Sequence, residues 1–135
     1  MSATINLFSR LRQLSGDSLT AVENMDRACL DLLIEKKGVD DLFKTKYKHY
    51  VLIEYSSSSV DQRLSSLMEA SLSQAFEEGL AVDAVISNSE AQSVNLWKLR
   101  EILPEAIRSS EAFFSFDISV PVSLVPDFIA TATVA

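Results

Sequence analysis

Apolar residues in this chain recur at helical spacing in some segments and at strand spacing in others, and the two kinds of segment alternate. The clearest strand is Tyr50–Tyr55, a nearly continuous run of β-branched and aromatic residues. Further strands are predicted at Leu19–Met25, Leu80–Ile86 and Phe113–Val120. A chain with this alternation buries its apolar side chains by packing helices against a sheet.

Five segments have the apolar spacing of amphipathic helices, so that one face of each can pack on the sheet. Their apolar positions span residues 5–14, 25–33, 64–76, 96–106 and 122–133. Gly38 follows two lysines, which suits a helix C-terminus, and Ser87 with Glu90 has the pattern of a capping box. Pro104 has no amide hydrogen, and we expect it to kink or restart the fourth helix.

The alternation of helices and strands predicts an α+β fold. We expect a ferredoxin-like α/β sandwich, in which helices pack on a sheet of about four mainly antiparallel strands. Connections of a dozen or more residues also permit a parallel sheet, and periodicity does not choose between the two. With 135 residues, the chain is long enough for a single domain, 1–135, with one core.

Charge and cysteine content exclude several classes of function. The net charge of −7 opposes contact with phosphates, so we expect no nucleic-acid partner. No apolar run reaches the roughly 20 residues of a membrane-spanning helix. Cys29 and His49 are the single cysteine and histidine, so the sequence offers neither an internal disulfide nor a His/Cys metal cage. We therefore predict a cytoplasmic protein without a metal, with peripheral membrane association as the alternative location.

The segment Leu96–Glu101 carries an arginine at the border of the apolar face of its helix. Arg100 lies about 100° around the helix from Leu99, taken as the centre of that face. An arginine there either covers apolar surface with its stem, or points into a pocket and binds a carboxylate with two parallel hydrogen bonds. The helical pattern alone favours the first role.

Four segments have the order and spacing found in one flavoenzyme family. They are Ser18–Asp26, Tyr50–Ser57, Leu96–Glu101 and Asp117–Pro121. Together they resemble the C-terminal, substrate-binding (cap) domain of FAD-linked oxidases of the vanillyl-alcohol oxidase type, over essentially the whole chain. Within this family the chain is similar to D-2-hydroxyglutarate dehydrogenase, D-lactate dehydrogenase and the FAD subunit of glycolate oxidase.

The resemblance implies an enzyme that oxidises a D-2-hydroxy acid to a 2-oxo acid and passes a hydride to FAD. Arg100 matches the arginine that binds the substrate carboxylate in the family. Ser115 stands where the family usually has a lysine that helps to hold the substrate, and Phe116 replaces the histidine or tyrosine that follows it. Pro104 stands where some members have a substrate-contacting threonine. These departures predict a different preferred acid or a loss of activity.

The resemblance also implies that FAD is bound mainly by a separate N-terminal domain and that a histidine-rich motif follows the cap segment. Residues 1–135 contain neither, so we expect a fragment with no cofactor, no catalytic residue and no activity of its own. In the full enzyme the partner would be a small 2-hydroxy acid. The alternative is a stand-alone ferredoxin-like module that binds a ligand or oligomerises without catalysis. An exposed apolar face would favour a homo-oligomer in either case.

Overall fold

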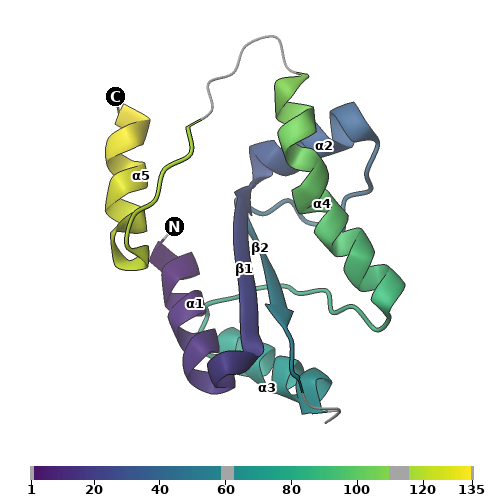
Figure 1. Ribbon diagram of the computed structural model, residues 1–135, viewed down its shortest axis with the longest axis vertical. Coiled ribbons are helices and arrows are strands. Elements are labelled where there is room, and N and C mark those ends of the chain that lie inside the picture. The colour runs from purple at the N-terminus through teal and green to yellow at the C-terminus, as the bar shows by residue number, and fades with distance from the viewer. Residues whose placement is uncertain (1, 59–62, 110–115, 135) are drawn as a thin grey trace. The chain divides into compact units, whose positions relative to one another are not determined.

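A computed structural model describes residues 2–58, 63–109 and 116–134 of the chain (Figure 1). Its helices and strands alternate in the first half, and helices follow in the second. The elements are α1 (Ser2–Ser15), η1 (Gly16–Ser18), β1 (Leu19–Asp26), α2 (Arg27–Lys37), β2 (His49–Tyr55), α3 (Arg63–Glu77), α4 (Glu90–Arg108), η2 (Val122–Leu124) and α5 (Val125–Val134). The predicted α+β class is confirmed.

The strands β1 and β2 pair with each other and run antiparallel. At one end of the ladder the amide of Arg27 donates to the carbonyl of Lys48 over 3.0 Å. At the other end the amide of Ser56 donates to the carbonyl of Ser18 over 2.9 Å. The end of β1 therefore meets the start of β2, which is antiparallel pairing. Both elements were predicted, and their bounds differ from the predicted ones by one residue.

The described residues form two strands where about four were predicted. The segment Leu80–Ile86 is turn and irregular backbone, and Val82 is 76% exposed. Of the predicted strand Phe113–Val120, residues 113–115 lie outside the described residues, and residues 116–120 are irregular. An apolar run is compatible with a strand, but a strand also needs a neighbour that pairs with it. The described part of the chain therefore has a two-stranded sheet, and it does not show the four strands of the predicted ferredoxin-like sandwich.

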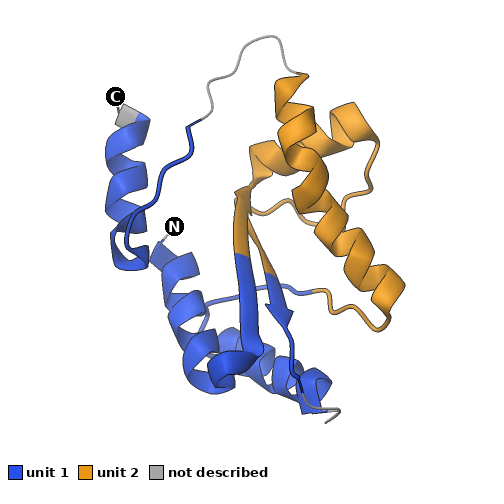
Figure 2. Cartoon of the chain, viewed as in Figure 1, with its two compact units in different colours: residues 1–22, 53–84, 116–135 blue, residues 23–52, 85–115 orange. Residues whose placement is uncertain are grey.

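The chain divides into two compact units, coloured separately in Figure 2. The first unit comprises residues 1–22, 53–84 and 116–135, and the second comprises 23–52 and 85–115. In the first unit α1 packs on α3, and in the second α2 packs on α4. The buried apolar side chains of these helices are Leu7, Leu11, Leu72 and Ala75 in the first unit, and Leu30, Leu33 and Ala106 in the second. Each unit thus has a small core of its own.

Contacts at both ends fix the helix α2. The carboxylate of Asp26, the N-cap residue, accepts a hydrogen bond from the amide of Cys29 over 3.0 Å. At the other end Gly38 has a φ of +64° and donates its amide to the carbonyl of Ile34 over 3.1 Å, the left-handed cap that glycine adopts readily. Burial and the nearby Asp26 raise the pKa of the Cys29 thiol, which keeps it protonated and unreactive.

Arg27 anchors the connection between α2 and β2. Its guanidinium contacts Asp31 at 2.7 Å and Asp41 at 2.6 Å, and it donates to the hydroxyl of Tyr50 over 2.8 Å. The ring of Tyr50 lies 5.8 Å from the guanidinium carbon and packs against Phe43. Arg27 also lowers the pKa of both aspartates by hydrogen bonding to them. This connection, residues 38–48, is therefore held by an ion-pair network.

Replacing the cap of α2 tests the local contacts of the helix. We expect Asp26→Ala to lower the free energy of unfolding by about 1 kcal/mol, because it removes the acceptor for the Cys29 amide. Chemical denaturation measures this loss. Asp40→Ala, an exposed aspartate in the following loop, is the matched control. An equal effect of both substitutions would show that the cap does not stabilise α2.

The Arg27 network predicts a pH-dependent contribution to stability. A carboxyl whose folded-state pKa is depressed stabilises the fold above its unfolded pKa of about 3.9, and this contribution is lost as the pH falls through the folded pKa. We therefore expect Arg27→Met to lower the melting temperature at neutral pH and to have much less effect at about pH 2. Thermal unfolding of this variant and of the exposed Arg12→Met control measures the difference. Equal losses at both pH values would contradict the prediction.

Candidate anion-binding site

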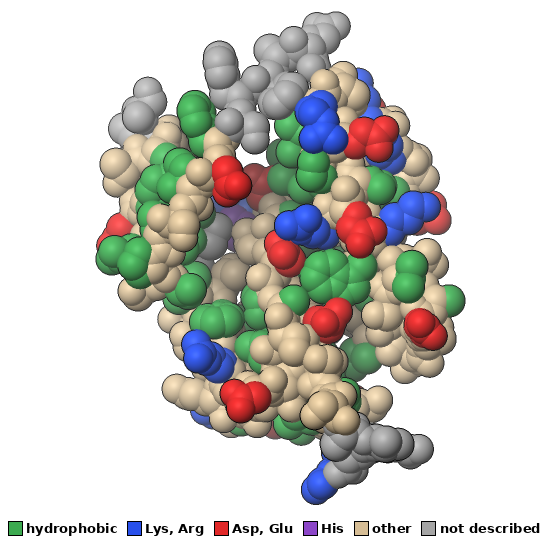
Figure 3. All heavy atoms as spheres, in the orientation of Figure 1, with side chains coloured by type: hydrophobic (Ala, Val, Ile, Leu, Met, Phe, Trp, Pro, Cys, Tyr) green, Lys and Arg blue, Asp and Glu red, His purple; other side chains and the backbone are tan. Residues whose placement is uncertain are grey.

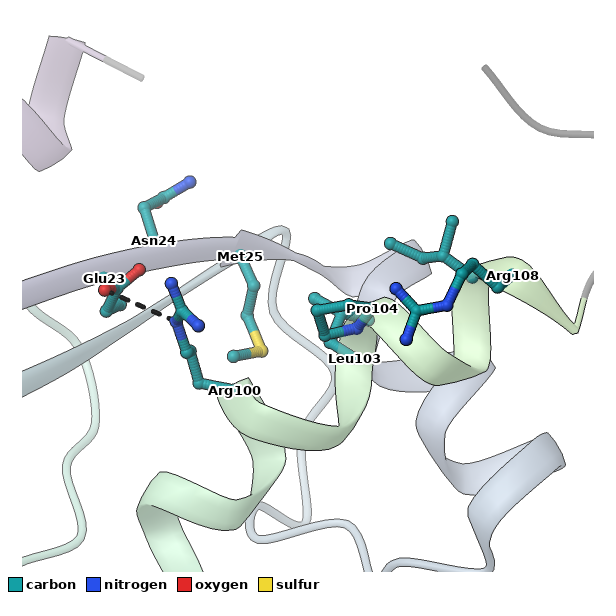
Figure 4. Close-up of a pocket in the computed structure, with 8 residues that line it drawn as sticks. Glu23, Asn24, Met25, Arg100, Leu103, Pro104 and Arg108 are labelled. Atoms are coloured by element: carbon teal, nitrogen blue, oxygen red, sulfur yellow. Dashed lines mark ion pairs between the residues drawn. The ribbon is translucent and has the colours of Figure 1, made fainter. Parts of the chain in front are cut away.

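A pocket of about 390 Å³ lies in the second unit, where β1 passes α4 (Figure 4). Two elements supply all the residues that line it. Its wall consists of Glu23, Asn24 and Met25 from β1, and Arg100, Leu103, Pro104, Ile107 and Arg108 from α4. The wall therefore combines two guanidiniums and one carboxylate with apolar side chains.

The helical repeat brings the residues of α4 to one face. Arg100, Pro104 and Arg108 follow each other at intervals of four residues, and Leu103 and Ile107 do the same. Residues three and four apart lie on the same side of a helix, so these five side chains face β1 together. The pocket thus follows from the sequence of α4 once the helix lies beside β1.

The start of α4 differs from the prediction. The helix begins at Glu90, and its N-cap is Ser89, whose hydroxyl accepts from the amide of Gln92 over 3.3 Å. The Gln92 side chain reaches back and accepts from the amide of Asn88 over 2.6 Å. The predicted capping box of Ser87 and Glu90 is therefore wrong, because a serine two residues later makes the contact with its own partner at the third helical position.

The helix does not restart at Pro104. α4 is a single helix over Glu90–Arg108, and Pro104 lies inside it. The proline still has no amide hydrogen to donate to the carbonyl of Arg100, four residues earlier. One hydrogen bond of the helix is therefore missing at the pocket, beside the arginine of interest.

The guanidinium of Arg100 lies at the edge of the pocket and faces β1. Its Nε is 3.5 Å from Oε1 of Glu23, the ion pair drawn in Figure 4. The side chains of the pair are 49% and 39% exposed, so water screens their attraction. Within the described part of the chain, no hydrogen bond engages the two terminal nitrogens of Arg100. The guanidinium therefore keeps donors that an anion in the pocket can use.

Sequence reasoning missed a second guanidinium in the pocket. Arg108 is the last residue of α4 and lies two turns after Arg100 on the same face. Figure 4 shows the two guanidiniums on either side of Pro104. Among the residues that the structure describes, Arg108 forms no ion pair. The interval of four residues from Arg100 to Pro104 and on to Arg108 is the signal that could have identified it.

Two of the predicted site residues line the pocket. Arg100 and Pro104 line the same pocket, as their spacing on one helix requires. Ser115 lies outside the described residues, and Phe116 is 79% exposed. His49 lies on β2 outside the pocket lining, and burial lowers its pKa. Among residues 2–58, 63–109 and 116–134, no group of three or more His, Cys, Asp or Glu side chains is placed to hold a metal ion.

The arrangement is suited to binding an anion. The lining residues carry two positive charges and one negative charge, and Met25, Leu103 and Ile107 supply apolar wall around them. The guanidiniums can donate charge-assisted hydrogen bonds to an anion, and the apolar side chains can contact the carbon atoms attached to it. Glu23 is the only described lining residue that could transfer a proton, and it is paired with Arg100. The pocket is therefore equipped to bind an anion.

The chain matches the family described as FAD linked oxidases, C-terminal domain, over residues 1–134, and it belongs to this family. The resemblance found in its four segments is thereby confirmed. In the described residues this family segment has an α+β architecture with two strands.

Three relatives illustrate the family. The probable mitochondrial D-2-hydroxyglutarate dehydrogenase of Oryza sativa subsp. indica is 36% identical over 120 residues, which are 87% of this chain and 21% of that protein. The D-2-hydroxyglutarate dehydrogenase of Stutzerimonas stutzeri is 35% identical over 82% of this chain and 23% of its own length. A putative mitochondrial D-lactate dehydrogenase of Schizosaccharomyces pombe is 26% identical over 93% of this chain and 24% of its own length.

The chain spans about a fifth to a quarter of the length of these relatives. The rice and yeast proteins are mitochondrial by name, whereas the name of the bacterial protein gives no compartment. No helix among the described residues is long and apolar enough to cross a membrane. The predicted cytoplasmic location and the likeness to the FAD subunit of glycolate oxidase stay predictions.

Removing the carboxylate of the pocket tests whether it competes with a bound anion. We expect Glu23→Gln to strengthen the binding of butanoate about fivefold, because an exposed ion pair of up to about 1 kcal/mol no longer has to be broken. Chemical shift changes in an NMR titration of the 135-residue chain measure the affinity. Glu101→Gln, an exposed glutamate of α4 outside the pocket lining, is the control. Weaker binding by Glu23→Gln would assign the carboxylate a supporting role instead.

Proposed function

We propose that this chain is the substrate-binding (cap) portion of an FAD-dependent D-2-hydroxy-acid dehydrogenase, and that Arg100 binds the carboxylate of the acid. The parent enzyme would oxidise a D-2-hydroxy acid to a 2-oxo acid. One observation carries the proposal: the guanidinium of Arg100 lies at the wall of a pocket and retains hydrogen-bond donors. Family membership and the names of the relatives support the same chemistry.

Arg100 would bind the substrate carboxylate through the N–H donors of its planar guanidinium. A carboxylate that accepts two parallel hydrogen bonds is fixed in direction as well as in position. Glu23 would give up its contact with Arg100 when the acid enters. Met25 and Leu103 would contact the carbon chain, so that the hydroxyl-bearing carbon is presented in one orientation. In this proposal the chain binds and orients the acid.

Pro104 makes the pocket lining less polar at its position. It offers no hydroxyl and no amide hydrogen, so it can contact a substrate only through its ring carbons. We propose that the pocket therefore relies on guanidiniums for polar contacts, and that its preferred acid differs from that of relatives with a threonine there. Ser115 would contribute to the same specificity.

FAD would accept the hydride. The described part of the chain has no glycine-rich loop placed to bind the pyrophosphate of FAD. Gly16, Gly38 and Gly79 have positive φ and each follows a helix, at the end where the helix dipole is negative. Phosphates bind instead at helix N-termini, where amide hydrogens are exposed. We therefore propose that a separate N-terminal domain holds FAD, and that residues 1–135, taken as one domain, bind none of it alone and are inactive.

The alternative function, a module that oligomerises without catalysis, is supported by exposed apolar side chains in the first unit. Figure 3 shows apolar side chains at the surface over α5. The exposed apolar residues in and beside this helix are Phe116, Ile118, Val122, Leu124, Phe128 and Ile129. Such a patch favours association with another surface. A homo-oligomer stays a prediction under either function.

Kinetics of the flavin-loaded enzyme that contains this chain test the proposed function. We expect Arg100→Gln to raise the KM for D-2-hydroxyglutarate or D-lactate roughly tenfold to 100-fold, because a charge-assisted hydrogen bond is lost. Flavin absorbance should stay unchanged. Lys98→Gln removes an equal charge from the same helix outside the pocket lining and is the control.

Two results would contradict the proposal. An unchanged KM in Arg100→Gln would remove Arg100 from the substrate site. A protein that carries no flavin and oxidises no D-2-hydroxy acid at its natural length would instead support the oligomerisation module. The proposed arginine contact and the proposed enzyme class are thus tested separately.

A further inference from the structure

Pro104 interrupts the hydrogen bonds of α4 where the helix borders the pocket. The helix continues through this proline, although proline is the least favourable residue for a helix interior. Its ring takes the place of the amide hydrogen that would bond to the carbonyl four residues earlier, and that carbonyl belongs to Arg100. Departures from good helix-forming sequence are expected at functional sites. The carbonyl of Arg100 is the group that this departure sets free.

The free carbonyl lies on the side of α4 that lines the pocket. In an α-helix a carbonyl points along the axis toward the amide four residues later, so its oxygen lies between those two residues on the helix surface. Arg100 and Pro104 both line the pocket, and Figure 4 shows them on consecutive turns of α4. The oxygen between them is therefore on the pocket side of the helix.

A carbonyl without its helical donor takes a hydrogen bond from another source. Backbone carbonyls in folded proteins are almost always paired with backbone, with side chains or with water, because an unpaired polar group shielded from water costs free energy. At the wall of a pocket, water is the natural donor in the free protein. A ligand that brings a hydroxyl of its own can replace that water and keep the hydrogen bond.

We propose that the carbonyl oxygen of Arg100 accepts a hydrogen bond from the hydroxyl of the 2-hydroxy acid whose carboxylate the same residue binds. This inference deepens the proposed function and rests on it. The ligand class is a carboxylate with a hydroxyl on the adjacent carbon. Pro104 acts indirectly, as a positioning residue that keeps the oxygen free of a helical partner.

The polar groups of Arg100 are complementary to such an acid. The guanidinium donates and the carbonyl oxygen accepts, whereas a 2-hydroxy acid presents an accepting carboxylate beside a donating hydroxyl. An unsubstituted acid can use only the guanidinium. Met25 and Leu103 contribute apolar side chains to the lining and do not compete for the hydroxyl. The carboxylate of Glu23 is the competing acceptor, and it is paired with the guanidinium of Arg100.

The same contact distinguishes the 2-hydroxy acid from the 2-oxo acid formed by its oxidation. Oxidation removes the hydroxyl hydrogen as a proton and the hydrogen of the adjacent carbon as a hydride, which passes to FAD. The remaining ketone oxygen can only accept, so it is repelled by the carbonyl oxygen of Arg100. An amide carbonyl is too weak a base to take the proton. It therefore orients the hydroxyl, and the base belongs to another part of the parent enzyme.

Three four-carbon probes test the inference. D-2-Hydroxybutanoate, 2-oxobutanoate and butanoate share a carboxylate and a carbon chain and differ at the second carbon. We expect the 135-residue chain to bind D-2-hydroxybutanoate about fivefold more tightly than butanoate in an NMR titration, because it makes one more hydrogen bond. We expect 2-oxobutanoate to bind no more tightly than butanoate, because it brings no donor.

Pro104→Ala tests the role of the free carbonyl. This variant restores an amide hydrogen at position 104, which can donate to the carbonyl of Arg100. We expect it to bind D-2-hydroxybutanoate and butanoate equally and to melt at a higher temperature than the wild-type chain. Slow hydrogen exchange of the new amide would show that the carbonyl is engaged. Pro126→Ala is the matched control, because Pro126 lies in the first turn of α5, where amides have no helical acceptor.

The ratio of the two affinities separates this contact from a general change in the pocket. Loss of the proline ring or a shift of α4 would change both affinities by a similar factor and keep their ratio. A fivefold ratio that persists in Pro104→Ala, that is lost in Glu23→Gln or that is absent from the wild-type chain overturns the inference alone. Unchanged binding of both probes in Arg100→Gln overturns the proposed function. A ratio lost only in Pro104→Ala, in a chain that melts at a higher temperature, supports the contact.

Discussion

The packing of α4 against α2 is the constraint on which the candidate site depends. Leu30 and Leu33 of α2 are buried, and Ala106 of α4 is fully buried with its small side chain, which lets the helices approach closely. Lys37 and Glu105 join the same helices at 2.7 Å. Because Ala106 fixes one side of α4, the other side, which carries Arg100 and Arg108, is held toward β1. The pocket lining is therefore positioned by the apolar packing of α4 on α2 together with one ion pair between them.

Local sequence patterns were sufficient to predict the helices, but they did not show which segments pair as strands. The helices were found because each repeats apolar residues on one face and ends at a residue such as Gly38, whose conformation favours a stop. The strand at 49–55 was found because it is a nearly continuous run of β-branched and aromatic residues, and the strand at 19–26 because Thr20 and Val22 favour extended backbone. Residues 80–86 have a similar run but pair with no strand, since pairing depends on a partner far away in sequence.

In the candidate site, too, some residues were predicted from the sequence and others were not. Arg100 and Pro104 were identified by their place in a family motif on one helix, and the structure brings both to one pocket. Glu23 was not identified, because only the tertiary contact between β1 and α4 places it near Arg100. Arg108 was missed although its interval of four residues from Pro104 was visible, because it lies outside the four segments that carry the family resemblance.

The pairing of Arg100 with Glu23 explains how a pocket with a bound counter-charge can still accept a ligand. The two side chains are 49% and 39% exposed and meet at 3.5 Å, so their attraction is worth at most about 1 kcal/mol. A ligand carboxylate that accepts two parallel hydrogen bonds from the guanidinium makes a fuller contact than Glu23 makes at Nε. A ligand can therefore replace Glu23 without breaking a strong ion pair. In the free protein, the same weak ion pair balances one positive charge of the pocket, and it leaves the terminal nitrogens of Arg100 available for a ligand.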